Sequence, residues 1–444
     1  MPDLTIGFAR ADITPPLGTP MIGYFYNGKT PRTAQSVHDP LYASAMVVRS
    51  GGTGAALVGV DTLSIKRRTA TAAREAVARA LGILIENIMV SASHTHSGPA
   101  VCTALGYKAD ERAISVLHDG IVTAAREAAA QARPLRLGVA CGAEHRFTHC
   151  RRHWMRSGVV MCQPPPFSPD VLRPEGPEDP EIGVLAALDD RGQVQGLWFN
   201  YAVHAQVCGG AAGEISADWP GYVRRAIDER LGRPIVSVFG QGAAGNMNAA
   251  GVYQRSRQWG HPLAAEMGRG LSENILNLCE TVRASADSAA VRGAERWLEL
   301  PMREVTDKML AWAREAKAAG KEYEPRFNGP APLTAFEGLA LAEKRKRHDK
   351  ALALVQAIRI GPAAIVGVPC EFFSDLGLRI KRESPIQPTF VVELANGCVG
   401  YVPTKDAHAH GGYETILSRT SKLVPEAGDV MVGTALELLR QLSV

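Results

Sequence analysis

Residues 55–93 read AALVGVDTLSIKRRTATAAREAVARALGILIENIMVSAS, and this stretch decides the fold. The apolar run at 55–63 is typical of a buried strand, and the alanine- and arginine-rich segment 67–81 contains no helix breaker. A second apolar run follows at 87–93. Apolar strands that alternate with helices are typical of sheets with parallel strands and helices on their faces. The stretch therefore predicts an α/β fold.

The same alternation continues along the chain. The pattern predicts further strands at 135–141, 182–188, 194–203, 235–239, 353–360, 363–368 and 390–394, and helices at 111–133, 220–231, 262–280, 372–382 and 429–442. We expect mixed or mostly parallel sheets flanked by helices, in one large domain spanning 1–444 with a helical insertion at 303–349. The proline-rich segment 163–180 predicts a long irregular loop, which in a compact domain usually has a functional role.

The composition excludes several classes of protein. Lys and Arg total 49 against 45 Asp and Glu, so the net charge of +4 does not favour an electrostatic nucleic-acid binder. No run approaches the roughly 20 apolar residues of a membrane-spanning helix. The basic run EKRKRHDK at 343–350 follows a helical stretch, and we interpret it as a solvated helix face.

The eight cysteines are scattered and form no CxxC pair, which favours reduced thiols. The N-terminal sequence MPDLTIGFARADITPP has neither the basic start nor the apolar core of a secretory signal. Together these features predict a cytoplasmic protein. The sequence leaves the oligomeric state undecided.

The strongest local signal for chemistry is SASHTHSGP at 91–99. His94 and His96 are two residues apart, and on an extended segment such residues point to the same face. They follow the carboxyl end of a predicted buried strand, where α/β sheets bind ligands. The pair can therefore reach one metal ion, or one metal ion and its substrate. A pair of loop histidines without a metal is the simpler alternative.

Four further residues extend this signal. His204 ends another apolar strand, Glu371 precedes a predicted helix, and Tyr401 and Tyr413 flank a glycine-rich loop. Each has a structural alternative, such as a core histidine or an acid at a helix N-terminus. Together they place ligand-type side chains at strand and loop ends, which is how a catalytic zinc site with an open coordination position is built. Asp61 could orient a histidine ligand or cap the helix at 67–81.

The order of motifs resembles that of the neutral/alkaline (non-lysosomal) ceramidases. The matching segments are GFARADITPPLG, HDPLYASAMVV, SASHTHSGP, NYAVHA, SADWPG, GQGAAGN, GVPCEFF, ANGCVGYVPT and GGYE, which together cover about residues 5 to 430. The resemblance implies a single ceramidase-like catalytic domain that binds Zn²⁺ and hydrolyses the N-acyl bond of a small-molecule amide.

Site residues are implied by the same resemblance, motif by motif. The zinc ligands would be His94, His204, Glu371 and Tyr401. His96 and Tyr413 would contact the substrate amide, and Tyr413 would stabilise the oxyanion. An arginine of the segment RFTHCRRHW would also face the substrate, and we choose Arg152 over Arg151.

The chain departs from the ceramidase pattern after its glycine-rich strand. Ceramidases carry GDVSPN there, with a serine proposed to act in catalysis, whereas this chain reads GNMNAA and has Asn248 at the serine position. A carboxamide cannot be acylated, so we expect direct attack by metal-activated water, with Asn248 and Gly242 contacting the substrate.

Two further departures concern the substrate. Ceramidases continue into a C-terminal β-sandwich and are secreted or membrane-associated, whereas this sequence stops after one predicted helix and shows no export signal. We therefore expect a soluble amide smaller than ceramide.

Three functions other than amide hydrolysis are compatible with parts of the sequence. An esterase, lactonase or other C–N hydrolase could use the same zinc site. A binding domain without activity is disfavoured because all four ligand positions are filled. A nucleotide-binding role for GQGAAGN is disfavoured because the Lys-Ser/Thr of a P-loop is missing.

Overall fold

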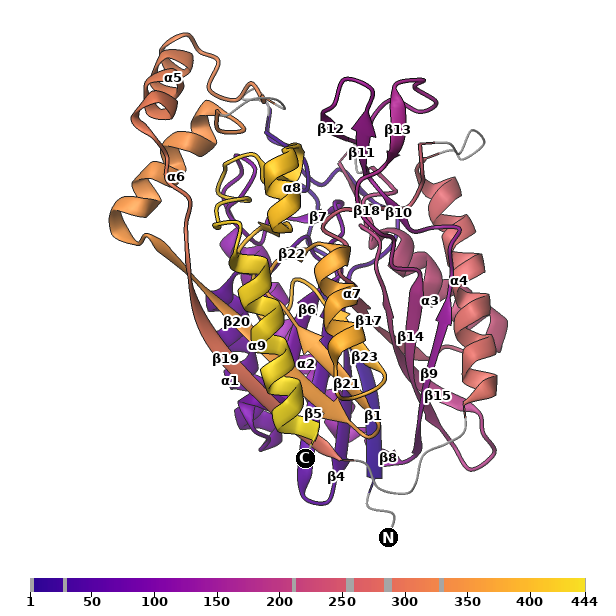
Figure 1. The fold of residues 1–444 in the computed structure, drawn as a ribbon. Coiled ribbons are helices and arrows are strands. Elements are labelled where there is room, and N and C mark those ends of the chain that lie inside the picture. The colour runs from indigo at the N-terminus through magenta and orange to yellow at the C-terminus, as the bar shows by residue number, and fades with distance from the viewer. Residues whose placement is uncertain are drawn as a thin grey trace.

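A computed structural model describes residues 4–26, 30–209, 213–252, 259–282, 290–326 and 331–443. Figure 1 shows its helices packed around several layered sheets. The largest sheet has the strand order β6-β5-β4-β1-β8. Its members are β1 (Leu4–Asp12), β4 (Tyr42–Ser50), β5 (Thr53–Val60), β6 (Ile88–Ala92) and β8 (Arg133–Pro134).

The predicted strand–helix–strand unit lies in this sheet. Helix α1 (Arg67–Leu81) connects β5 to β6, and these two strands are parallel. The structure confirms the predicted bounds of α1, which ends at Gly82 in the left-handed conformation that glycine adopts most readily. Helix α2 (Glu111–Ala130) packs beside α1 on the same apolar face of the sheet.

A second sheet has the order β17-β15-β14-β9. Strands β9 (Arg136–Ala143), β14 (Glu181–Leu188) and β15 (Val194–Tyr201) are antiparallel neighbours. Helix α3 (Asp218–Leu231) then leads to β17 (Val236–Gln241), which runs parallel to β15. Together with α4 (His261–Thr281), α3 covers the outer face of this sheet, because the apolar side chains of both helices join one buried cluster with it.

The third sheet has the order β19-β20-β21-β23 and carries α7 and α9 on its outer face. In Figure 1 these two helices stand side by side at the front. The bounds of the elements are β19 (Val291–Pro301), β20 (Lys350–Ile360), β21 (Ala363–Gly367), α7 (Ser374–Glu383), β23 (Thr389–Val392) and α9 (Ala427–Ser443).

One apolar cluster joins all three sheets, since it contains side chains such as Phe8, Trp198 and Phe390. Burying apolar area on this scale is the main driving force for folding. The sheets approach closely: a Cβ added to Gly59 of β5 would lie 2.3 Å from the carbonyl oxygen of Phe239 in β17. Only glycine fits at this position.

Short elements complete the chain. They are β2 (Met21–Ile22), β3 (Ser36–Val37), η1 (Ile85–Asn87), β7 (Gly98–Pro99), β10 (His149–Cys150), β11 (Arg152–Met155), β12 (Val160–Cys162), β13 (Val171–Pro174), β16 (Glu214–Ile215), β18 (Met247–Asn248), β22 (Glu371–Phe372), β24 (Tyr401–Val402), α8 (Lys405–His410) and η2 (Tyr413–Thr415). Of these, η1 leads into the amino end of β6, and several of the others lie at the end of the sheets where the site is.

The fold agrees with the predicted class and corrects two details. The sheets are mixed, and antiparallel pairs outnumber parallel pairs among the described strands, so the mostly parallel alternative is wrong. Residues 163–180 are not entirely irregular, because β13 pairs with β11 there. Proline tolerates such an edge position because its missing N–H faces away from the partner strand.

The predicted insertion at 303–349 contains α5 (Asp307–Ala318) and α6 (Ala335–Arg347), with 327–330 outside the described residues. Figure 1 shows both helices extending beyond the body of the molecule at the upper left. Treating 1–444 as one domain with this insertion remains a prediction. Within the described ranges, no helix has the length and apolar character needed to cross a membrane.

Candidate metal centre and active site

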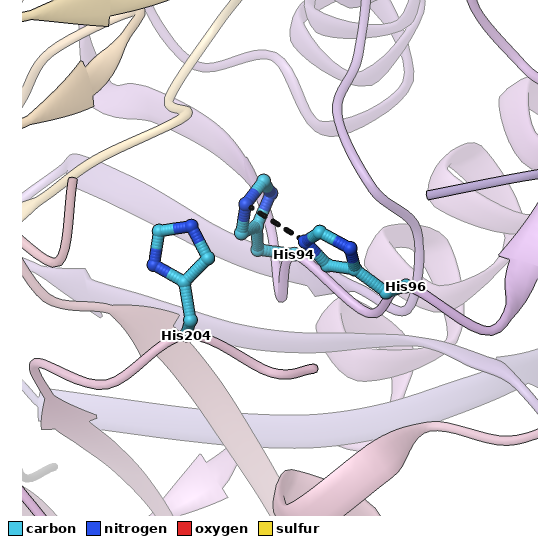
Figure 2. A group of neighbouring side chains, drawn as sticks. All are labelled: His94, His96 and His204. Carbon is cyan, nitrogen blue, oxygen red and sulfur yellow. Dashed lines mark hydrogen bonds between the residues drawn. The ribbon is translucent and has the colours of Figure 1, made fainter. Parts of the chain in front are cut away.

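Three histidines converge at the carboxyl ends of β6 and β15. His94 and His96 follow β6, and His204 follows β15. Their ring nitrogens offer one ligand atom each, and these atoms all lie within 4.8 Å of one another. Figure 2 shows the three rings pointing toward a common point. All three side chains are buried, so the group is a built site and not a chance surface cluster.

The backbone at His94 differs from the extended segment that we predicted. Its φ of 66° is left-handed, and its N–H donates to the carbonyl of Thr62. The chain therefore turns between the two histidines. Their rings still meet, with centroids 4.9 Å apart and planes at 87°, and Nε2 of His96 lies 3.4 Å from Nε2 of His94. The two side chains share one site because of this turn and not because of strand alternation.

Backbone carbonyls orient two of the imidazole rings. Nδ1 of His94 donates to the carbonyl oxygen of Leu63 at 2.8 Å, and Nδ1 of His204 donates to that of Ala244 at 2.7 Å. Because a carbonyl can only accept, each Nδ1 carries a proton, and in the neutral ring this leaves the lone pair on Nε2, which faces the site. This arrangement of a second-shell acceptor behind the ring is typical of histidine ligands of metals.

Glu371 supplies the carboxylate of the group. Its Oε2 lies 3.5 Å from Nε2 of His94 and 3.5 Å from Nε2 of His204. Neither Oε2 of Glu371 nor Nε2 of His204 has a hydrogen-bond partner among the described residues, although both atoms are buried. Ligand atoms of a tetrahedral zinc site with bonds of about 2.0–2.1 Å are separated by roughly 3.3 Å. The unsatisfied atoms therefore fit a metal ion.

Protonation states favour the same interpretation. Burial, with Arg151 and His94 nearby, lowers the pKa of His204 to about 3, so its ring is neutral near pH 7. Burial alone would raise the pKa of Glu371, but the neighbouring His94 and His204 hold it well below its usual range. A neutral imidazole beside an ionised carboxylate is the state in which these groups bind metals.

Tyr401 is brought to Glu371 by strand pairing. Strands β22 and β24 are parallel, and Glu371 stands opposite Tyr401 in their register. Tyr413 packs edge-on against Tyr401, with ring centroids 5.7 Å apart. Burial and the charge of Glu371 raise the pKa values of both phenols, so both keep their protons near neutral pH without a metal.

Arg151 lines the site, and the expected Arg152 does not. Its Nη2 donates to the hydroxyl oxygen of Tyr401 at 3.2 Å and to the carbonyl of Gly245 at 2.9 Å. Its Nε donates to Oε1 of Glu414 at 2.8 Å. Arg151 lines the cavity that contains His94 and Glu371.

Arg152 points away from the cavity. Its Nη1 donates to Oε2 of Glu414 at 2.7 Å, and its Nε and Nη2 pair with Glu175. Arg151 directly precedes β11 and Arg152 is its first residue, and both pair with Glu414, but only Arg151 lines the cavity. The sequence alone does not show which of two adjacent arginines lines the cavity.

A cavity of about 1770 Å³ opens onto the metal centre. Its lining includes five of the predicted site residues, namely His94, His96, Glu371, Tyr401 and Tyr413. A cavity of this size can hold a substrate well beyond the usual range of small-molecule sites.

The other predicted residues lie behind the cavity lining. Asn248 is buried, and its Oδ1 accepts from Nε2 of Gln206 at 3.3 Å, so Asn248 reaches the cavity through Gln206, which lines it. Gly242 packs against the backbone of Ala202 and is not part of the lining. Asp61 neither caps α1 nor contacts a histidine ligand, because it forms a buried ion pair with Arg224 at 2.6 Å.

Two buried acids were missed by the sequence analysis. Glu393 accepts from the N–H of Ala244 at 3.1 Å and of Phe372 at 2.8 Å, so it supports the carbonyl that orients His204 and the strand that carries Glu371. Glu414 accepts from both Arg151 and Arg152. A lone acid in the apolar strand FVVEL was the available signal for Glu393.

Several known proteins resemble this chain in sequence and in fold. A neutral ceramidase of Pseudomonas aeruginosa is 25% identical over 92% of this chain and 68% of its own. The crystal structure of neutral ceramidase from Pseudomonas aeruginosa superposes with a TM-score of 0.72 at 21% identity, over 100% of this chain and 75% of that one. A ceramidase complexed with C2 gives a TM-score of 0.73 at 20% identity, over 99% and 75%.

The family models agree. The model described as neutral/alkaline non-lysosomal ceramidase, N-terminal, matches residues 4–251, more than half of the chain. This match includes both histidine segments of the metal centre, and the likeness of fold extends over the remaining residues. The chain therefore belongs to the neutral/alkaline non-lysosomal ceramidase family.

Proposed function

We propose that this protein is a zinc-dependent hydrolase that cleaves the amide bond of an N-acyl compound with water. One observation carries the proposal: buried, unsatisfied ligand atoms of His204 and Glu371 converge with Nε2 of His94 at spacings that suit a tetrahedral ion. Membership of the ceramidase family supports an amide as the scissile group.

The residues present fit a bound zinc ion. His94, His204, Glu371 and Tyr401 would hold it, which gives the nitrogen and oxygen donors that zinc accepts. When bound, zinc supplies a Lewis acid that polarises an acyl carbonyl and activates a water molecule. The proximity of His96 to His94 also fits His96 as a ligand, and metal content of single variants separates these roles.

Tyr413 and Arg151 stabilise charge on the substrate oxygen in this proposal. Because its pKa is raised, Tyr413 stays protonated and can donate a hydrogen bond to an oxyanion. Arg151 is held by Glu414 and Gly245 and keeps its positive charge beside Tyr401. Such preorganised donors stabilise a tetrahedral intermediate without further rearrangement.

His96 is the proposed proton carrier. Burial and the neighbouring His94 and His204 lower its pKa well below the usual range, so its ring is neutral near pH 7 and has a lone pair that can take up a proton only transiently during turnover. Its ring also packs edge-on against Tyr24, with centroids 5.5 Å apart, which limits its rotation.

Asn248 argues for direct attack by water. At this position the chain has a carboxamide, which cannot form an acyl-enzyme. Asn248 instead holds Gln206 at the cavity wall, and we propose that this pair positions the substrate. Release of the amine should therefore show no burst ahead of the acid; a trapped acyl-serine would contradict the mechanism.

The substrate and the location of the protein are further parts of the proposal. We propose a soluble substrate smaller than ceramide, because residues of α6 and of the segment after it line the cavity mouth. The cysteines described in the structure are free, in keeping with the cytoplasm that we propose as its compartment.

The test combines metal content with a substrate panel. Purified protein should contain about one zinc per chain and should hydrolyse N-acyl compounds faster than esters or lactones of matched size. His94→Ala should lose both metal and activity, whereas His118→Ala, on a partly exposed face of α2, should retain both. Full metal content and turnover in His94→Ala would overturn the proposal. Faster hydrolysis of esters than of amides would show that the enzyme is an esterase.

A further inference from the structure

The cavity that opens onto the metal centre is strongly basic. Its lining contains eleven Lys or Arg residues against four Asp or Glu residues. The basic run at 343–350, which we interpreted from the sequence as a solvated helix face, supplies five of these cations. A ceramide-like substrate is neutral, so catalysis of amide hydrolysis does not by itself explain this excess of positive charge.

Part of the charge is neutralised by neighbouring acids. Arg419 forms a two-pronged pair with Glu337, with both bonds at 2.8 Å, and Arg151 is paired with Glu414. At the mouth, Lys346 pairs with Glu343 and Lys350 pairs with Glu299. These cations need no ligand to balance their charge.

Three lysines of the lining lack such a partner. Lys66 precedes α1, Lys344 lies in the last turn of α6, and Lys422 follows η2. No carboxylate of the described residues forms an ion pair with any of them. We call these three residues the lysine cluster.

Lys422 is the buried member of the cluster, with 4% of its surface exposed. Its ammonium donates to two backbone carbonyls, those of Val399 and of Arg419. An ammonium group has three N–H donors, so one remains for a ligand. Burying a cation without an opposite charge is costly, and an anion in the cavity would offset that cost.

The three lysines line one cavity and are close enough to influence one another's ionisation. Burial and the charges of Lys344 and Lys66 lower the pKa of Lys422 to about 7. Burial, followed by the charges of Lys66 and Arg419, also lowers the pKa of Lys344. Mutual repulsion of this kind is relieved when a negatively charged group binds among the three side chains.

The lysine cluster and the metal centre share one wall of the cavity. Val399, which accepts from Lys422, and Tyr401, a proposed metal ligand, are two residues apart on the segment that leads into β24, and both line the cavity. A single substrate can therefore place its amide at the metal centre and another group at the cluster.

We propose that the lysine cluster binds an anionic group of the substrate, so that the enzyme acts on N-acyl compounds that carry a carboxylate, such as N-acyl amino acids. This inference rests on the proposed amidohydrolase function. An anionic lipid surface is the less suitable occupant, because Lys422 is buried within the cavity and a bilayer surface cannot reach it.

The test compares two substrates that differ in charge and little in size: N-octanoylglycine and N-octanoylethanolamine. We expect kcat/KM to be at least about tenfold higher for the glycine compound, the order of effect of a hydrogen bond to a charged group. In Lys344→Met and Lys422→Met this ratio should fall toward one. Lys317→Met, which removes an exposed lysine of α5 outside the cavity, should keep the wild-type ratio.

The outcomes separate the inference from the proposed function. A wild-type ratio near one, or an unchanged ratio in Lys344→Met, overturns the inference even if both amides are hydrolysed. Because much of the Lys344 side chain is open to solvent although its ammonium lies near other cations, its variant should fold, and it decides the matter if Lys422→Met does not fold. If Lys344→Met loses binding to phosphatidylglycerol vesicles but keeps the ratio, the cluster serves a membrane surface and the inference is wrong.

Absence of hydrolysis of both compounds would instead count against the proposed function. Calorimetric titration of the same two compounds then tests the lysine cluster without interference from turnover. Tighter binding of N-octanoylglycine, lost in Lys344→Met, would support the anion site. Equal binding of the two compounds would overturn it.

Discussion

The metal centre and the lysine cluster lie in the same cavity but are built in opposite ways. At the metal centre backbone carbonyls orient the rings of His94 and His204, and the ionised Glu371 faces the neutral ring of His204. In the lysine cluster like charges lie near one another, and the nearby acid Glu337 is already paired with Arg419. The first region is arranged for a cation and the second for an anion. One cavity can thus orient a substrate with a polar amide and a charged end.

The largest effect is expected from His204→Ala at the metal centre. Loss of a ligand should abolish zinc binding and lower kcat/KM by at least about a thousandfold, because a Lewis acid supplies several kcal/mol of transition-state stabilisation. Metal analysis and kinetics check this result. The lysine cluster should be unaffected, so N-octanoylglycine should still bind more tightly than N-octanoylethanolamine. Loss of that difference would show that the two regions are not separate.

The next effect is on stability, at the buried ion pairs behind the metal centre. Arg152→Met leaves Glu175 without its buried partner and should lower the free energy of unfolding by about 3–5 kcal/mol. Arg230→Met, which breaks an exposed pair with Glu273, should cost no more than about 1 kcal/mol. Denaturant unfolding measures both. Equal decreases in the free energy of unfolding for the two variants would mean that the Arg152 ion pairs do not stabilise the site.

Tyr413→Phe tests the oxyanion donor. Removing one preorganised donor should lower kcat by roughly 10²–10³-fold, while zinc content stays at the wild-type value. The preference for N-octanoylglycine over N-octanoylethanolamine should also persist, because the Tyr413 hydroxyl lies near the metal centre and is not part of the lysine cluster. A change in KM alone would indicate that Tyr413 binds the ground state and does not stabilise the transition state.

The smallest effect is a pH dependence of the substrate preference. Lys422 is faced by Lys344, Lys66, Cys398 and Glu337, and its pKa is lowered to about 7, so it loses its proton as the pH rises through that value. The ratio of kcat/KM for the glycine and ethanolamine compounds should therefore fall a few-fold between about pH 6 and pH 8.5. Both compounds are hydrolysed at the same metal centre, so any pH dependence of that centre affects both values of kcat/KM equally and leaves their ratio unchanged. If the ratio still depends on pH in Lys422→Met, a group other than Lys422 is responsible for the pH dependence.

The same lysine affects stability with a defined sign. Its pKa in the folded state lies below the unfolded value, so the folded protein binds fewer protons between these two values. The charged ammonium costs stability below about pH 7, and that cost disappears as the pH rises toward the unfolded pKa. Lys422→Met should remove this cost. It should therefore raise the free energy of unfolding most at pH values below 7.

The sequence by itself determined the local elements and the chemical types at the site. Alternating apolar and helical segments predicted the strand–helix–strand unit with the observed bounds of α1, since local periodicity reports which face of an element is buried. The motif order pointed to the family that the comparisons show. His94, His96 and Glu371 could be proposed because ligand-type side chains follow predicted strands in the order of the ceramidase motifs.

Only the tertiary structure decided which of these side chains meet and what surrounds them. The choice of Arg151 over Arg152 depends on which side of β11 faces Tyr401, 250 residues away. Asp61 faces Arg224, and not a histidine, for the same reason. The basic run at 343–350 reads as a solvated helix, yet packing brings it to the mouth of the cavity. Periodicity fixes an element's buried face, but the partner on that face comes from distant segments, and only packing in three dimensions selects it.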